Sequence, residues 1–76
     1  MEDFQALYEI LEDALGIDRD EIQEEKKLRE DLGADSVDLF QIFVAMEEEY
    51  KIELDTDETE HVSTIGDLMQ IVRDYV

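Results

Sequence analysis

The centre of the chain reads DLGADSVD at residues 31–38, and a helix is predicted to begin inside this segment. Gly33 interrupts the backbone, Asp35 is a favourable N-cap residue, and Asp38 three positions later completes a capping-box pattern. Because Asp35 takes the capping role, the hydroxyl of Ser36 at the first helical position is not needed for capping. We therefore expect this hydroxyl to face solvent, where it can be modified.

The helix that follows, predicted over residues 36–50, carries two apolar stripes. At about 100° per residue, five side chains share one arc and are expected to face the core: Leu39, Ile42, Phe43, Met46 and Tyr50. The second stripe consists of Val37, Phe40 and Val44, with Ser36, Gln41, Glu47 and Glu48 beside it. Either this stripe packs under a long loop, or it stays exposed as an apolar strip rimmed by carboxylates. The second arrangement is typical of a weak protein-binding site.

The N-terminal part of the chain predicts one helix and one long loop. Apolar residues at three- and four-residue steps indicate an amphipathic helix over residues 4–15, which Gly16 ends. Residues 17–29 are expected to form a mostly irregular loop with at most one helical turn. The apolar residues expected to attach this region to the core are Ile22, Leu28 and Leu32.

Two further capping patterns lie in the C-terminal part. Asp55 with Glu58 predicts the start of a short helix, and Thr64 with Asp67 predicts the start of a last one. The apolar face of that last helix is expected to contain Ile65, Leu68, Met69, Val72 and Tyr75. We therefore predict an all-α fold, in which a small antiparallel bundle has three main helices plus one short helix and a long first loop. The whole chain, residues 1–76, is expected to form a single domain.

Composition limits the classes of partner. Six basic residues against 24 acidic ones give a net charge of −18, which disfavours nucleic acids and anionic membranes as partners. Basic proteins are favoured instead, and weak, non-specific binding of divalent cations is expected. The chain has no cysteine, so it has no disulfide, and we expect a cytoplasmic protein. No apolar run is long enough to span a membrane, and no signal peptide is evident.

Ser36 is better interpreted as an acceptor of a chemical group than as a catalyst. A serine hydroxyl is a weak nucleophile unless a base activates it, and no local motif pairs the sole histidine, His61, with Ser36. We expect His61 to be a solvated surface residue. A domain of 76 residues also leaves little room for an oxyanion hole and a substrate pocket. The sequence therefore predicts a protein that is not an enzyme.

The segments LGADS at residues 32–36 and AMEEEY at residues 45–50 resemble acyl carrier proteins, especially the free-standing carriers of fatty acid synthesis. This resemblance extends over nearly the whole chain. It implies that Ser36 carries 4′-phosphopantetheine, which a separate transferase adds from coenzyme A, with Asp35 helping to orient a magnesium ion in that enzyme. The thiol of the arm would then carry acyl groups as thioesters. The family's usual Asp-Ser-Leu triplet ends here in Val37.

The resemblance also implies two surfaces. A docking face for basic surfaces of the transferase and of fatty acid synthesis enzymes would contain Asp35, Val37, Asp38, Phe40, Val44, Glu47 and Glu48. An interior that shelters the acyl chain would be lined by Leu39, Ile42, Phe43, Met46, Val62, Ile65 and Leu68. We expect the carrier to be a monomer.

Other functions stay open at this point. The acidic run at residues 55–60 looks like a calcium loop, but Thr59 and Glu60 stand where an EF-hand needs a ligand and glycine, so no specific metal site is predicted. An acidic module that blocks a basic protein would explain the charge but does not require the Asp35-Ser36 junction. A carrier of a polyketide or another specialised acyl pathway also fits the sequence, and on local sequence alone Ser36 could be a plain first-turn residue.

Overall fold

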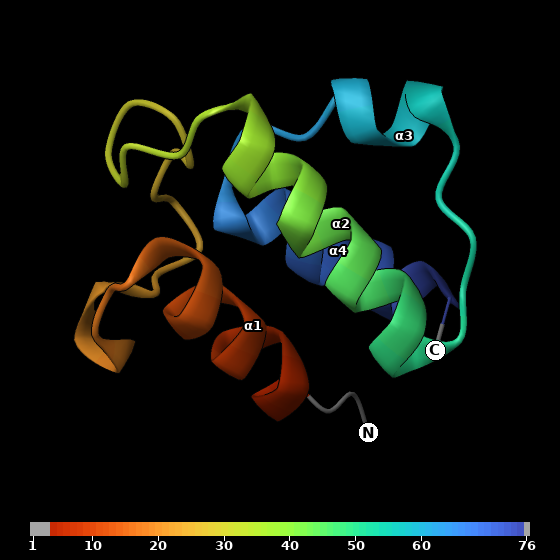
Figure 1. Ribbon diagram of the computed structural model, residues 1–76, viewed down its shortest axis with the longest axis horizontal. Helices are drawn as coiled ribbons and strands as arrows, with labels where there is room; N and C mark the ends of the chain where they lie inside the picture. The colour runs from red at the N-terminus through yellow and green to blue at the C-terminus, as the bar shows by residue number, and fades with distance from the viewer. Residues whose placement is uncertain (1–3, 76) are drawn as a thin grey trace.

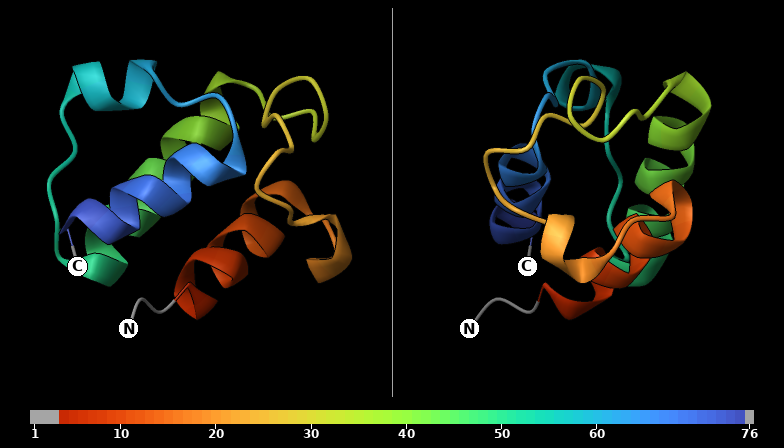
Figure 2. Two further views of the ribbon diagram at one scale, coloured as in Figure 1. Left: turned by 180° about the vertical axis from the view of Figure 1, so that it is seen from behind. Right: turned by 90° about the vertical axis from the view of Figure 1, so that its left-hand side faces the viewer.

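The computed structural model describes residues 4–75, which form a bundle of helices (Figure 1). The elements are α1 (Gln5–Leu15), the short 3-10 turn η1 (Arg19–Glu21), α2 (Ser36–Tyr50), α3 (Thr56–Glu60) and α4 (Ile65–Tyr75). α1 runs opposite to α2 and α4, and the short α3 lies on the side of α2 and α4 that faces away from α1 (Figures 1 and 2). The predicted all-α architecture of three main helices and one short one is confirmed.

The helix boundaries follow from the local sequence. Gly16 adopts a left-handed conformation with φ of 65°, and its N–H donates to the carbonyl of Glu12, which ends α1. The capping box of α2 is formed, since the Asp38 N–H donates to Asp35 Oδ1 at 2.9 Å and the Asp35 N–H donates to Asp38 Oδ2 at 3.2 Å. α2 ends at Tyr50, and the next residue, Lys51, takes the left-handed conformation although it is not glycine.

The other two predicted caps are also formed. The Glu58 N–H donates to Asp55 Oδ1 at 2.8 Å at the start of α3. At the start of α4, the Asp67 N–H donates to Thr64 Oγ1 at 3.2 Å, and the Asp67 carboxylate accepts from the Thr64 N–H at 3.0 Å. Each carboxylate satisfies backbone donors that the first turn of a helix cannot pair by itself.

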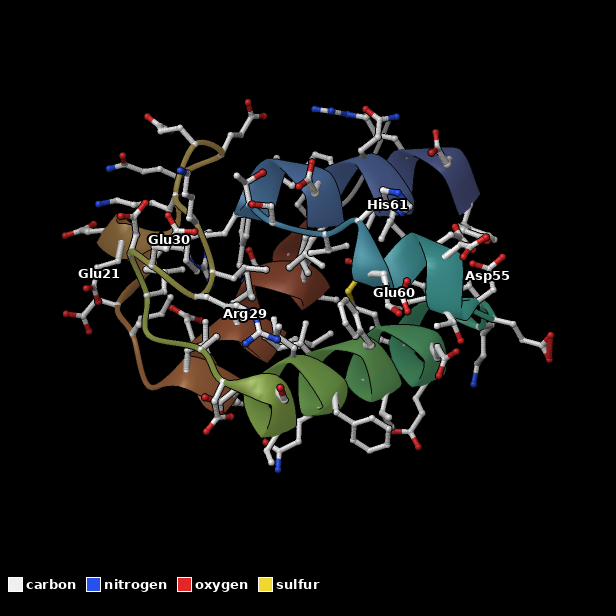
Figure 3. The ribbon with its side chains drawn as sticks, turned by 90° about the horizontal axis from the view of Figure 1, so that it is seen from above. Glu21, Arg29, Glu30, Asp55, Glu60 and His61 are labelled. Atoms are coloured by element: carbon white, nitrogen blue, oxygen red, sulfur yellow. The ribbon has the colours of Figure 1, made fainter. Side chains whose placement is uncertain are left out.

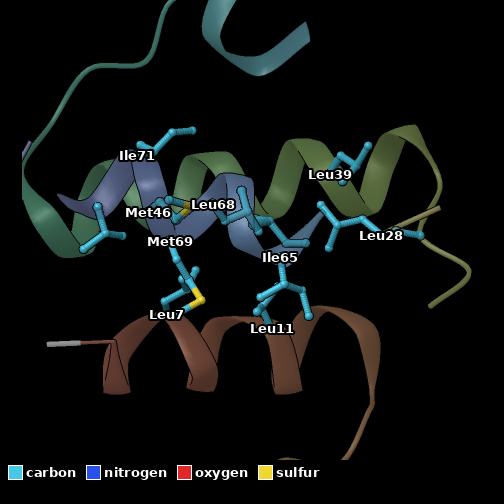
Figure 4. Close-up of a cluster of buried hydrophobic side chains, with 12 residues drawn as sticks. Leu7, Leu11, Leu28, Leu39, Met46, Ile65, Leu68, Met69 and Ile71 are labelled. Carbon is cyan, nitrogen blue, oxygen red and sulfur yellow. The ribbon is translucent and has the colours of Figure 1, made fainter. Parts of the chain in front are cut away.

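The core lies where α1, α2 and α4 meet (Figure 4). Its fully buried side chains are Leu7, Leu11, Leu28, Ile42, Met46, Ile65, Leu68 and Val72. Removing each such side chain from water stabilises the fold by about 1.5–3 kcal/mol. Leu28 belongs to the long loop and is 1 % exposed, and Ile22 and Leu32 pack partly against the core, so the predicted attachment of this loop is confirmed.

Backbone hydrogen bonds join the long loop to the start of α4. The Leu28 N–H donates to the Ser63 carbonyl at 2.9 Å, and the Ile65 N–H donates to the Lys26 carbonyl at 3.0 Å. The Gly66 N–H donates to the Glu24 carbonyl at 2.9 Å, and a Cβ at this glycine would lie 3.1 Å from that carbonyl oxygen. We call these paired segments, residues 24–28 and 63–66, the loop clamp. No local pattern in the sequence predicts it, because it joins segments far apart in the chain.

The predicted apolar face of α4 differs from the structure at two residues. Tyr75 was expected to face the core, but it is 42 % exposed, and its hydroxyl donates to Glu58 Oε1 on α3. The reason is that Tyr75 is the last residue of α4, where its hydroxyl reaches a carboxylate. Ile71, which was not assigned to that face, is buried at 7 % exposure.

Candidate functional site

Ser36 is the first residue of α2, and its side chain is exposed to solvent. Because the Asp35 carboxylate accepts the N–H of Asp38, the Ser36 hydroxyl is not used in the capping of this helix. Its polar contact is with the long loop, where Arg29 Nη2 donates to Ser36 Oγ at 3.4 Å. The expected exposure of this hydroxyl agrees with the structure.

Arg29 is a residue of the site that sequence reasoning missed. Figure 3 shows its guanidinium beside the start of α2, although it lies seven positions before Ser36 in the chain. Two hydrogen bonds fold this segment back, from the Ala34 N–H to the Leu28 carbonyl at 2.9 Å and from the Gly33 N–H to the Arg29 carbonyl at 3.2 Å. A signal was present in the sequence, because Arg29 is the basic residue that precedes Ser36 most closely.

A pocket of about 350 Å³ opens beside Ser36, between α2 and the α3 segment. It is lined by Arg29, Ser36, Leu39, Phe40, Phe43, Thr59, Glu60 and Val62. Half of these lining residues are polar, and the apolar ones are Leu39, Phe40 and Phe43 of α2 together with Val62. A group attached to Ser36 therefore has an apolar hollow next to its attachment point.

The structure divides the predicted acyl-chain lining into two sets. Leu39, Phe43 and Val62 border the pocket beside Ser36. The other four, Ile42, Met46, Ile65 and Leu68, each have no exposed surface and do not border it. A guest longer than the pocket would have to displace this packed second set.

The second apolar stripe of α2 is largely uncovered. Val37 is 63 % exposed and Phe40 is 68 % exposed, so neither packs under the long loop. Val44 is half-buried and borders a second hollow of about 190 Å³ near Leu54, at the link between α2 and α3. An exposed apolar strip is thus present on the face that contains Ser36.

The carboxylates around this strip differ in whether they already accept hydrogen bonds within the fold. Asp35 and Asp38 accept each other's backbone N–H groups in the capping box. Glu47 Oε2 accepts the N–H of Leu54 at 2.8 Å and so holds the link to α3. Glu48 is exposed. Glu48 therefore offers its charge to a partner with less cost to the fold than Glu47 does.

His61 lies directly after the end of α3, away from the start of α2 (Figure 3). Its Nδ1 is 2.6 Å from the carbonyl oxygen of Asp57, and it does not border the pocket beside Ser36. Asp55 and Glu58, in the acidic run, form the capping box of α3. Among residues 4–75 no group of three or more His, Asp or Glu side chains is placed to hold a metal ion.

The chain matches the phosphopantetheine attachment site family over residues 5–72. It is 41 % identical over 70 residues to the acyl carrier protein of Clostridium acetobutylicum. The aligned residues cover 92 % of this chain and 91 % of that protein. The chain belongs to the acyl carrier protein family. Its structure is similar to that of a provisionally assigned acyl carrier protein from Mycobacterium tuberculosis. That comparison has a TM-score of 0.88 and 29 % identity, and it covers 95 % of this chain and 96 % of the other.

Membership of this family makes the chain a carrier of acyl groups as thioesters on a 4′-phosphopantetheine group. The residues around Ser36 fit that group, since an exposed hydroxyl, a helix N-terminus and the Arg29 guanidinium meet beside an apolar pocket. The group supplies a thiol that the cysteine-free chain lacks. No helix within residues 4–75 is both long and apolar enough to cross a membrane.

Proposed function

We propose that Ser36 is the attachment point and that the carrier delivers acyl intermediates to the enzymes of fatty acid synthesis. The observation that carries this proposal is the exposed Ser36 hydroxyl, which is spared from capping because Asp35 and Asp38 form the box. The 41 % identity to an acyl carrier protein over most of the chain supports the carrier role.

Loading would be a phosphoryl transfer in which Ser36 is the acceptor. Its Oγ forms a bond to the pantetheine-bearing phosphorus of coenzyme A. The bond from that phosphorus to the bridging oxygen breaks, and adenosine 3′,5′-bisphosphate leaves. The polar contact of Ser36 Oγ is with Arg29, a cation that cannot accept a proton. The carboxylates of Asp35 and Asp38 accept backbone N–H groups in the capping box, so we assign the hydroxyl proton to a base of the transferase. The chain thus contributes position and accessibility, and the second enzyme contributes catalysis.

Docking would use the exposed face of α2. Val37 and Phe40 offer an apolar centre, and carboxylates such as Glu48 offer a charged rim to basic partners. A small interface of this kind binds weakly, which suits a carrier that must visit several enzymes and leave each one. Phe40 is the largest exposed side chain of this centre, so it is expected to influence which partners fit.

The loading proposal is tested by intact-protein mass after incubation with coenzyme A and a phosphopantetheinyl transferase. The wild-type chain should gain the mass of one prosthetic group, and Ser36→Ala should gain none while keeping its helical circular dichroism spectrum. Ser63→Ala is the matched control, because Ser63 is the other serine of the chain and should not affect loading. A chain that stays unmodified under these conditions overturns the proposal.

The docking proposal is tested by charge reversal at Glu48, which has no role in holding the link to α3. Glu48→Lys should weaken binding to a basic partner enzyme by about threefold to tenfold at low salt, and less at high salt. Glu25→Lys makes the same charge change on the exposed part of the long loop and should have a smaller effect. Equal effects of the two reversals would show that net charge, rather than the face of α2, governs docking.

The pathway depends on which acyl group the carrier receives. A carrier for polyketide or other specialised acyl transfer would share the fold and the arm. The mass of the loaded carrier isolated from its own cells would separate these pathways, because it identifies the acyl group. The cytoplasmic location, the monomeric state, the single-domain assignment, the absence of catalysis by the chain itself and the weak binding of divalent cations also stay predictions.

A further inference from the structure

We propose that Arg29 binds the phosphodiester of the prosthetic group and so holds the phosphate end of the phosphopantetheine arm beside the opening of the pocket. This inference rests on attachment at Ser36. It assigns a role to a side chain that neither the capping of α2 nor the docking face explains.

The pairing of the basic residues supports this role. The chain has three arginines, and two of them pair with carboxylates, Arg19 with Glu12 at 3.1 Å and Arg73 with Glu24 at 3.8 Å. Within residues 4–75 no carboxylate oxygen lies within salt-bridge distance of Arg29. In a chain with 24 acidic residues, this guanidinium instead contacts the Ser36 hydroxyl.

The backbone on both sides of Arg29 is fixed. The preceding residue, Leu28, is buried in the core and is bonded to Ser63 in the loop clamp. The Arg29 carbonyl accepts the N–H of Gly33, which has a φ of 73° and so turns the chain back toward α2. The side chain of Arg29 therefore extends from a held backbone, so no backbone freedom has to be lost when its guanidinium binds an anion.

The negative charges at the start of α2 explain why a cation is needed there. A phosphodiester on Ser36 would bring a negative charge close to the carboxylates of Asp35 and Asp38, which oppose it. The N-terminus of the helix favours the anion, and an arginine fork can bind two phosphate oxygens at once. Arg29 is the cation placed to offset those two carboxylates.

The position of the contact indicates the phosphodiester rather than the acyl cargo. Ser36 Oγ, 3.4 Å from Arg29 Nη2, would itself become an oxygen of the phosphodiester, one bond from phosphorus. The thioester lies at the opposite end of the arm. Arg29 is thus expected to act in the same way whatever acyl group is carried.

The test compares Arg29→Gln with Arg19→Gln, which makes the same change in net charge away from Ser36. Both variants are loaded and confirmed by mass, and the 31P resonance of the phosphodiester is recorded at low and high salt. Arg29→Gln should move this resonance at low salt, with a smaller displacement at high salt, and Arg19→Gln should leave it in place. Arg29→Lys, which keeps the charge, should return the resonance part of the way to its wild-type position.

Melting temperatures provide a second readout. The difference in melting temperature between the loaded and the unloaded protein should be smaller by about 1–4 °C in Arg29→Gln than in the wild type. Because each variant is compared with its own unloaded form, any general loss of stability cancels. Arg19→Gln should show the wild-type difference.

The experiment distinguishes a failure of the Ser36 proposal from a failure of the Arg29 proposal. If the wild type cannot be loaded, the proposal for Ser36 fails. If all variants are loaded and share one 31P resonance and one melting difference, Ser36 is the attachment point and the role of Arg29 is overturned.

Discussion

The two segments that border the Ser36 end of α2 are held in different ways. On one side, the loop clamp joins residues 24–28 to residues 63–66 through three backbone hydrogen bonds, and Leu28 anchors it in the core. On the other side, α3 has no buried residue. Its contacts with the rest of the fold include the side-chain bond between Glu58 and Tyr75. Local stability should therefore be high on the Arg29 side of the site and low on the α3 side.

This difference suits a carrier that must fix an attachment point and still accept cargo. The clamped side holds Ser36 and Arg29 in place. The pocket lies against the weakly held side, where Thr59, Glu60 and Val62 form part of its wall. A guest that enters the pocket should displace α3 rather than the loop, because moving α3 exposes little apolar surface.

The largest expected effect is on the free energy of unfolding when one side chain is truncated in the loop clamp and one beside α3. Leu28→Ala should lower the free energy of unfolding by about 2–5 kcal/mol, because it leaves a cavity in the core. Val62→Ala should lower it by about 1 kcal/mol or less, since Val62 is only half-buried. Urea denaturation of both variants measures the two losses. Losses of equal size would contradict the unequal attachment of the two sides.

A second prediction concerns where an acyl chain perturbs the structure. When the carrier is loaded with an acyl chain, NMR resonances of Leu39, Phe43 and Val62 should shift, because these residues border the pocket. Leu7 and Leu11, which pack from α1, serve as internal controls and should shift much less. Shifts confined to Ser36 and Arg29 would show that the chain stays outside the protein. Shifts at Ile42 and Met46 would show that it enters the packed core.

The smallest expected effect is the pH dependence of the α3 attachment. The hydrogen bond to Glu58, with smaller contributions from desolvation and nearby carboxylates, raises the pKa of Tyr75 from 10.0 to about 12. Since the folded pKa exceeds the unfolded one, this contribution is fully present below pH 10 and is lost as the pH rises toward 12.

The measurement for this prediction is the difference in stability between the wild type and Tyr75→Phe as a function of pH. The difference should be constant below pH 10 and should fall between pH 10 and 12. Contributions from all other groups are common to both proteins and cancel in this difference. A stability difference that does not change across this range would show that the hydrogen bond from Tyr75 to Glu58 does not stabilise the attachment of α3 to α4.

Local patterns predicted the helix starts well. Asp35, Asp55 and Thr64 cap the helices that their spacing to Asp38, Glu58 and Asp67 indicated, because a capping box needs only residues three positions apart. The buried position of Leu28 was likewise expected from its place among charged neighbours.

Contacts that depend on the folded path of the chain were not predictable in this way. The bridge between Lys27 and Thr64 joins residues far apart in the sequence, and no local pattern indicates it. The approach of Arg29 to Ser36 depends on how residues 28–34 turn back. Tyr75 had the right spacing for the core but lies at the end of α4, where it is exposed.

The central claim is that Ser36 Oγ accepts the phosphopantetheine group, and peptide fragmentation of the loaded protein tests it most directly. After loading with coenzyme A and a transferase, fragment masses should place the group on Ser36 and leave Ser63, in the loop clamp, unmodified. A group found on Ser63 or on any threonine, or a loaded Ser36→Ala variant, would contradict the account.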